Sequence, residues 1–239
     1  MLFLHGVGSD KSVWKPQLAH FGRSRRALAL DYPGYGESEF IEGADRDDYA
    51  AAALAAMDAL GIGRAHVCGL SLGGVVAIAM TAAAPERCAS VVIADSFAVH
   101  PDGQGIYDRS VAASNSMSMR ELAEARAGML LGSGASDALR EEVIATMGKI
   151  DPAAYRLGAA AVWLADQQDR AAGIAAPTLI LVGTEDSITP PALSDELGRL
   201  VVGSRVVVIE AAGHLANAEQ PLAFNAAIDR FLEEVEARV

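Results

Sequence analysis

Residues 69–74 read Gly69-Leu70-Ser71-Leu72-Gly73-Gly74 and directly follow the apolar run Ala65-His66-Val67-Cys68. The spacing Gly-x-Ser-x-Gly after an apolar run predicts a strand that turns sharply into a helix, because glycine tolerates a turn too tight for a side chain. A serine at such a turn projects its hydroxyl away from the sheet, where a base can reach it. The stretch therefore predicts Ser71 as a nucleophile.

Apolar runs of strand length recur on both sides of this turn. They span residues 1–4, 26–31, 66–70, 90–95, 177–182 and 205–210. Runs such as Val91-Val92-Ile93 do not alternate with polar residues, which indicates strands buried on both faces. Helical patterns lie between them, at residues 45–60, 72–84, 190–200 and 221–235. The alternation predicts an α/β fold with a mostly parallel, doubly wound sheet of about six strands.

One long segment interrupts this rhythm. Residues 97–173 contain no convincing strand, and their pattern predicts three helices at residues 118–131, 136–150 and 152–169. Such an insertion is too long for a plain crossover between strands. We interpret it as a helical cap over the carboxyl edge of the sheet, where open α/β sheets bind ligands, with residues 1–96 and 174–239 forming the core.

Composition excludes several classes of function. The 239 residues carry a net charge of −12, which disfavours nucleic acid and anionic membranes as partners. The two cysteines, Cys68 and Cys88, have neither the spacing of a zinc site nor that of a disulfide framework. No secretory signal and no apolar run of membrane-spanning length is visible, so we expect a cytoplasmic protein.

A serine nucleophile needs a base, and the base needs an acid to orient it. His214 follows the last apolar run, in the position expected for the chain order serine, acid, histidine. Asp186 follows the preceding strand and is the favoured acid. Its neighbour Glu185 is expected to point elsewhere on the turn, and Asp95, at the end of another strand, is the rival acid.

Ester chemistry also needs donors for a developing oxyanion. The backbone N–H of Leu72, next to the nucleophile, is one expected donor. The other is expected from the loop His5-Gly6-Val7-Gly8 after the first strand, through the N–H of Val7. In this loop His5 is interpreted as a structural residue.

Together these segments resemble the α/β-hydrolase superfamily over essentially the whole chain. The residues that carry the resemblance are His5-Gly6-Val7-Gly8, Asp31-Tyr32-Pro33-Gly34-Tyr35-Gly36-Glu37-Ser38, Gly69 to Gly74, Gly183-Thr184-Glu185-Asp186 and Ala212-Gly213-His214. Residues 188–191 and 213–225 are similar to 3-oxoadipate enol-lactonases and related carboxylesterases. The resemblance implies a Ser71–Asp186–His214 triad beneath a helical lid.

Two departures bear on the reaction. Enol-lactonases of this type usually have Met at the position of Leu72 and a polar pair at His5-Gly6, which favours a general ester hydrolase here. Ser71 argues against dehalogenases and epoxide hydrolases, which carry Asp at that position. We therefore predict a serine hydrolase that cleaves carboxylic esters through an acyl-enzyme and requires no metal or organic cofactor.

Alternatives remain open at this stage. One is a lactonase of the 3-oxoadipate enol-lactonase type, acting in aromatic-compound breakdown, and another is a non-catalytic ligand receptor with the hydrolase fold. In the cap, Trp163, Met129 and Arg126 are expected to bind the small-molecule ester or lactone. A carboxylate anchor, which a dicarboxylate lactone would need, is expected among Arg109, Arg120, Arg126 and Arg156.

The amino end departs from the family, which usually has two strands before residues 1–4. Without them, the strand at residues 26–31 is expected to be an exposed edge of the sheet. Either the start is truncated or misassigned, or a partner covers the edge, for example a second copy in a homodimer.

Overall fold

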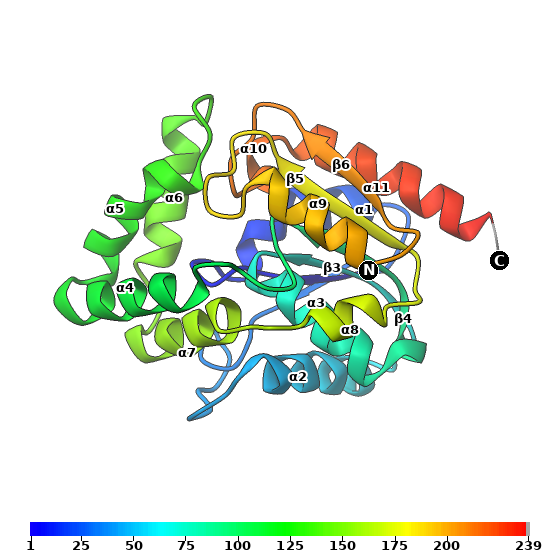
Figure 1. The fold of residues 1–239 in the computed structure, drawn as a ribbon, viewed down its shortest axis with the longest axis horizontal. Helices are drawn as coiled ribbons and strands as arrows, with labels where there is room; N and C mark the ends of the chain where they lie inside the picture. The colour runs from blue at the N-terminus through cyan, green and yellow to red at the C-terminus, as the bar shows by residue number, and fades with distance from the viewer. Residues whose placement is uncertain (238–239) are drawn as a thin grey trace.

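The computed structural model describes residues 1–237, and a single parallel sheet of six strands forms its centre (Figure 1). The strand order is β2-β1-β3-β4-β5-β6, and every neighbouring pair is parallel. The strands are β1 (Leu2–Leu4), β2 (Leu28–Leu30), β3 (Ala65–Leu70), β4 (Cys88–Ala94), β5 (Thr178–Gly183) and β6 (Arg205–Ile209). All six predicted strands are confirmed, with shorter bounds at the amino end.

Side chains of the strands alternate between two separate cores. In β1, Leu2 and Leu4 join one apolar cluster, whereas Phe3 joins the other. Helices cover both faces, as the doubly wound fold requires. The first cluster lies under α2 (Arg46–Ala59), α3 (Leu72–Ala83) and α9 (Pro191–Leu200), and the second under α1 (Lys15–Phe21) and α11 (Pro221–Glu236). Within residues 1–237, no helix combines the length and the apolar composition needed to cross a membrane.

The segment between β4 and β5 is helical, with five helices where three were expected. It contains α4 (Gly103–Ser116), α5 (Met119–Leu130), α6 (Asp137–Met147), α7 (Pro152–Trp163) and α8 (Gln168–Ala172). Helix α4 escaped prediction because its sequence holds two glycines and several serines, which have low helix propensity. The expected helix over residues 152–169 ends at Trp163 and resumes as α8. In Figure 1, α4 to α7 gather at one end of the molecule, whereas α8 lies against α3 and α9. That residues 97–173 act as one cap stays a prediction.

Strand β2 is an edge strand. Within residues 1–237 it pairs with β1 alone, and its three residues are half-buried. The exposed edge expected at residues 26–31 is therefore confirmed, whereas the dimer stays a prediction.

The turn after β3 brings backbone against backbone. A Cβ atom on Gly73 would overlap the carbonyl oxygen of Leu4, and one on Gly69 would overlap the carbonyl oxygen of Gly73. Helix α3 therefore starts in direct contact with β1 and β3, which places residue 71 at the carboxyl edge of the sheet.

We expect the substitution Gly73→Ala to destabilise the protein, because the new methyl group meets a buried backbone carbonyl that cannot rotate away. Overpacking of this kind costs about 1–3 kcal/mol, which corresponds to a fall in Tm of several degrees for a chain of this length. The matched control is Gly63→Ala, since a Cβ there meets no atom within 4 Å. Thermal unfolding followed by circular dichroism compares the two, and equal Tm values would contradict the packing argument.

Candidate active site

Ser71 occupies the turn between β3 and α3 in a backbone conformation rarely adopted by residues other than glycine. Its φ is +54° and its ψ is −114°. Conformations of this kind cost free energy and persist where the surrounding structure enforces them, often at functional sites. Here the Ser71 N–H donates to the carbonyl of Ala94, and the Ser71 carbonyl accepts from the Ser96 hydroxyl. Both sides of the strained residue are thus bonded to residues at, or just after, the end of β4.

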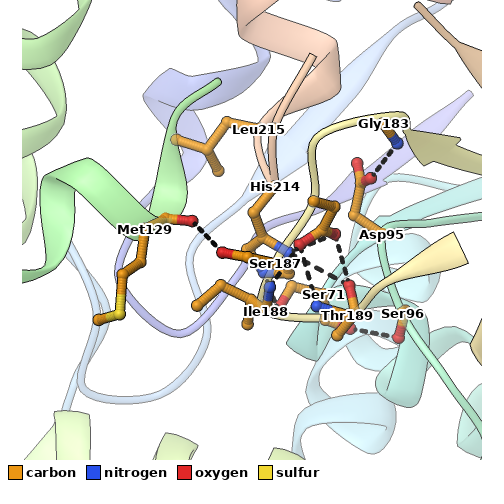
Figure 2. A network of polar contacts seen from close by, with 12 residues as sticks. Ser71, Asp95, Ser96, Met129, Gly183, Ser187, Ile188, Thr189, His214 and Leu215 are labelled. Carbon is orange, nitrogen blue, oxygen red and sulfur yellow. Dashed lines mark hydrogen bonds and ion pairs between the residues drawn. The ribbon is translucent and has the colours of Figure 1, made fainter. Parts of the chain in front are cut away.

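Three polar side chains form a hydrogen-bonded chain at this edge. His214 Nε2 lies 2.9 Å from Ser71 Oγ, and His214 Nδ1 lies 2.8 Å from Asp186 Oδ2. Figure 2 shows Ser71, His214 and Thr189 converging from three different segments of the chain. A proton on Nδ1, facing the carboxylate, leaves Nε2 free to accept from the serine hydroxyl. Ser71, Asp186 and His214 are each at most 4% exposed, so their hydrogen bonds are shielded from water.

The Asp186 carboxylate is held by the turn that follows it. Its Oδ1 accepts from the N–H groups of Ile188 and Thr189, and its Oδ2 accepts from the Thr189 hydroxyl at 2.6 Å. Burial acts to raise the pKa of this carboxyl, but the neighbouring His214 and the bonds from Thr189 lower the pKa below its ordinary value. Sequence reasoning assigned no role to Thr189, although a threonine three residues after an aspartate is a common turn pattern.

The two other carboxylates considered as the acid lie elsewhere. Asp95 is fully buried at the end of β4, and its Oδ1 accepts from the Gly183 N–H rather than from His214. Burial and the nearby charge of Asp186 raise the pKa of Asp95 well above its ordinary value. Glu185 points away from His214 and accepts from the Ser133 N–H. The structure thus pairs His214 with Asp186.

The loop after β1 lies directly beside Ser71. A Cβ on Gly6 would sit 3.4 Å from Ser71 Cβ. Buried His5 fixes this loop, since its Nδ1 lies 2.8 Å from the carbonyl oxygen of Gly6. In a trans peptide, the Gly6 carbonyl and the Val7 N–H point in opposite directions, so holding the carbonyl at His5 turns the Val7 N–H away from it. Within residues 1–237, neither the Val7 N–H nor the Leu72 N–H donates a hydrogen bond, so both remain available to a ligand.

A cavity of about 170 Å³ opens onto Ser71 and His214. Its walls come from the loop after β1, the start of α1, and helices α5, α6 and α7. Of the residues expected to bind substrate, Arg126 and Trp163 line this cavity. Met129 does not: its side chain is half-exposed, and its contribution is a backbone carbonyl that accepts from Ser187 (Figure 2). The neighbouring Leu130, one position further around α5, lines the cavity instead.

The fold and this geometry are those of a hydrolase built on an α/β sheet. Residues 1–227 match the model of a family described as "Alpha/beta hydrolase family", and the chain belongs to that family. It is 27% identical to 3-oxoadipate enol-lactonase 1 of Acinetobacter baylyi, over 99% of this chain and 89% of the relative.

Two solved structures are also similar. The enol-lactonase from Burkholderia xenovorans LB400 matches with a TM-score of 0.91 at 26% identity, over 97% of this chain and 90% of that one. A thermophilic esterase from Thermogutta terrifontis, solved with malate bound, matches with a TM-score of 0.91 at 28% identity, over 98% and 89% of the two chains.

We expect Thr189→Val to lower the free energy of unfolding by about 1–3 kcal/mol at neutral pH, because the buried carboxylate loses a hydroxyl donor. The folded-state pKa of Asp186 is depressed, so its stabilising interactions are present above the pKa of the unfolded chain, about 3.9, and are lost as the pH falls through the folded value. The difference between wild type and variant should therefore shrink below about pH 4.

Denaturant unfolding at several pH values measures this difference. The control is Thr81→Val, because the Thr81 hydroxyl is equally buried but donates to the carbonyl of Ala77 in its own helix. Its effect should not change with pH in this range. A loss for Thr189→Val that is as large at pH 3 as at pH 7 would contradict the assignment.

Proposed function

We propose that this protein is a serine hydrolase that cleaves carboxylic esters, with Ser71, His214 and Asp186 as its catalytic triad. The observation that carries the proposal is the distance of 2.9 Å between His214 Nε2 and Ser71 Oγ at the wall of a cavity. The names of the relatives support the same chemistry, since enol-lactonases and esterases both break an ester bond.

The mechanism follows from the roles that each group can fill. His214 accepts the proton of Ser71 as the hydroxyl attacks the ester carbonyl, and the N–H groups of Val7 and Leu72 bind the resulting oxyanion. His214 then protonates the leaving alcohol, which forms the acyl-enzyme. A water molecule activated by His214 releases the acid, while Asp186 orients the imidazole and stabilises its positive charge.

The wider organisation belongs to the same proposal. Residues 97–173 act as a cap whose helices α5, α6 and α7 enclose the cavity, and residues 1–96 and 174–239 supply the triad and the oxyanion donors. A cytoplasmic location and a homodimer stay predictions.

We expect Ser71→Ala to lower kcat for p-nitrophenyl acetate and butyrate by roughly 10⁴-fold or more, because the remaining groups bind the ester but cannot form an acyl-enzyme. The control is Ser114→Ala, since the Ser114 hydroxyl donates within its own helix, to the carbonyl of Val111. Initial rates of p-nitrophenol release measure both. Equal rates for wild type and Ser71→Ala would refute the catalytic role of Ser71.

A second candidate is a hydrolase whose ester or lactone substrate also carries a carboxylate, as in the lactonase alternative. The observation that favours it is Arg126 on the cavity wall. Its Nη1 donates to the Tyr155 hydroxyl at 2.8 Å, and no carboxylate within residues 1–237 forms an ion pair with it. An arginine held by a neutral partner can offer its remaining N–H groups to a substrate carboxylate. The dicarboxylate malate bound to the similar esterase fits this reading.

We expect Arg126→Met to reduce the preference for a carboxylate-bearing ester. The matched substrates are the mono-p-nitrophenyl ester of succinate and p-nitrophenyl butyrate, whose acyl chains have the same number of carbons. The ratio of kcat/KM for succinate to that for butyrate should fall about tenfold or more, the loss expected for one charge-assisted bond. Arg120→Met is the control, because Arg120 lies on the same helix but pairs with Glu124 outside the cavity. An unchanged ratio would exclude Arg126 as the anchor.

A further inference from the structure

The carboxylate of Glu219 accepts hydrogen bonds from the loop that carries His214. Glu219 ends α10 (Ala216–Glu219), the short helix that follows this loop. Its Oε1 accepts from the N–H of Gly213 at 3.0 Å and from the N–H of Leu215 at 3.3 Å. These are the two residues on either side of His214, so one carboxylate oxygen fixes the backbone before and after the imidazole.

The other oxygen of this carboxylate reaches the predicted cap. Glu219 Oε2 accepts from the N–H of Gly132 at 2.7 Å, in the turn after α5. The N–H of His214 itself donates to the carbonyl of Leu130 at 2.9 Å, in the same turn. The turn at residues 130–132 and the His214 loop are therefore joined by hydrogen bonds that run in both directions.

The two loops also touch closely. A Cβ on Gly213 would lie 2.5 Å from the backbone nitrogen of Gly132 and 2.8 Å from the carbonyl carbon of Leu131. A Cβ on Gly132 would lie 3.0 Å from the Glu219 carboxylate. The two backbones are too close for a side chain to fit between them, so a displacement of the turn at Gly132 toward the His214 loop would displace that loop as well.

No basic side chain within the described part of the chain pairs with this carboxylate. Burial and the nearby charge of Glu185 raise the pKa of Glu219, and the backbone N–H groups of Gly132, Gly213 and Leu215 oppose that rise. Burying a carboxylate without a cation costs free energy, and a glutamate that served only solubility would lie in water. Its three charge-assisted hydrogen bonds to backbone N–H groups instead fix the position of the loop.

We propose that Glu219 is a positioning residue for catalysis, which holds His214 at hydrogen-bonding distance from Ser71 and ties that geometry to the turn at Gly132. The inference rests on the proposed function and names a residue outside the triad on which its geometry depends. Glu219 does not touch the substrate. It acts through the backbone of Gly213 and Leu215.

The experiment compares Glu219→Gln and Glu219→Ala with wild type by ester hydrolysis. We expect kcat to fall at least tenfold in Glu219→Ala and by a smaller factor in Glu219→Gln, which keeps one acceptor oxygen, with KM changed less than twofold in both. A general loosening of the cavity would instead raise KM. Thermal unfolding verifies that each variant is folded, and Glu219→Gln, nearly identical in shape, keeps the test open if Glu219→Ala fails to fold.

The matched control is Glu185→Gln. The Glu185 carboxylate accepts from the N–H of Ser133, the residue after this turn, whereas the N–H groups of Gly213 and Leu215 donate to Glu219. Its kcat should stay within about threefold of wild type. If Glu185→Gln loses as much kcat as Glu219→Gln, attachment of the turn accounts for the effect, and the positioning role of Glu219 is overturned.

A second readout separates this inference from the proposed function. The rate at which a fluorophosphonate labels Ser71 reports the reactivity of the serine without ester turnover. Labelling that is slowed at least tenfold in Glu219→Ala supports the inference. If only Glu219→Gln folds, clearly slowed labelling of Glu219→Gln supports it. Wild-type rates in the folded variants overturn it while leaving the triad intact, whereas absence of labelling in wild type refutes the proposed function itself.

Discussion

The contact between the start of α3 and the backbone of β1 and β3 is the constraint on which the rest of the site depends. Only glycine at positions 69 and 73 allows the helix to begin so close to the strands. The turn that results forces Ser71 to a φ of +54° and turns its side chain toward the carboxyl edge of the sheet. Leu72 is the first residue of α3, and the first N–H groups of a helix have no acceptor within the helix. The Leu72 N–H is therefore free to bind a ligand. The proposed nucleophile and the proposed oxyanion donor are thus two consequences of one steric condition.

The same edge collects three buried or half-buried carboxylates. Each accepts hydrogen bonds from backbone N–H groups, and no lysine or arginine within residues 1–237 pairs with any of them. Asp186 is bonded by Ile188 and Thr189, Asp95 by Gly183, and Glu219 by three N–H groups. The pKa values of Asp95 and Glu219 are raised, whereas that of Asp186 is lowered, so Asp186 is the carboxylate whose negative charge favours the positive imidazolium proposed for His214 during acyl transfer. A cation beside Asp186 would weaken that effect. Arg126 also lines the cavity, but it lies on α5 and forms no ion pair with these carboxylates.

The parts of the molecule that sequence reasoning predicted well are those fixed by local rules. The six strands follow from uninterrupted apolar runs, and the turn at Ser71 follows from the glycines that the packing demands. Helix α4 was missed because tertiary contacts, not intrinsic propensity, hold its glycine- and serine-rich sequence in a helix. Met129 was expected to bind substrate, but Leu130 lines the cavity instead. Adjacent positions of a helix face different directions, and the sequence alone does not show which of two neighbouring apolar residues faces the cavity. The parts played by Thr189 and Glu219 depend on hydrogen bonds to backbone groups, and a residue pattern does not encode those partners.

The attachments between the helical insertion and the rest of the chain differ in strength around the cavity. On the His214 side, backbone hydrogen bonds and two glycines in contact hold the turn after α5. Helix α7 is also closely seated, since a Cβ on Gly158 would overlap the Tyr35 hydroxyl and approach the Val7 side chain. Between α6 and the start of α1, the link is an exposed ion pair, Lys15 with Glu142, and both residues border the cavity. Exposed pairs contribute about 0–1 kcal/mol, so on this side the apolar packing of Val143 against the core stabilises the contact more than the ion pair does. The cavity wall beside His214 is thus held by directional backbone hydrogen bonds, whereas the wall beside Lys15 is held mainly by non-directional apolar contact.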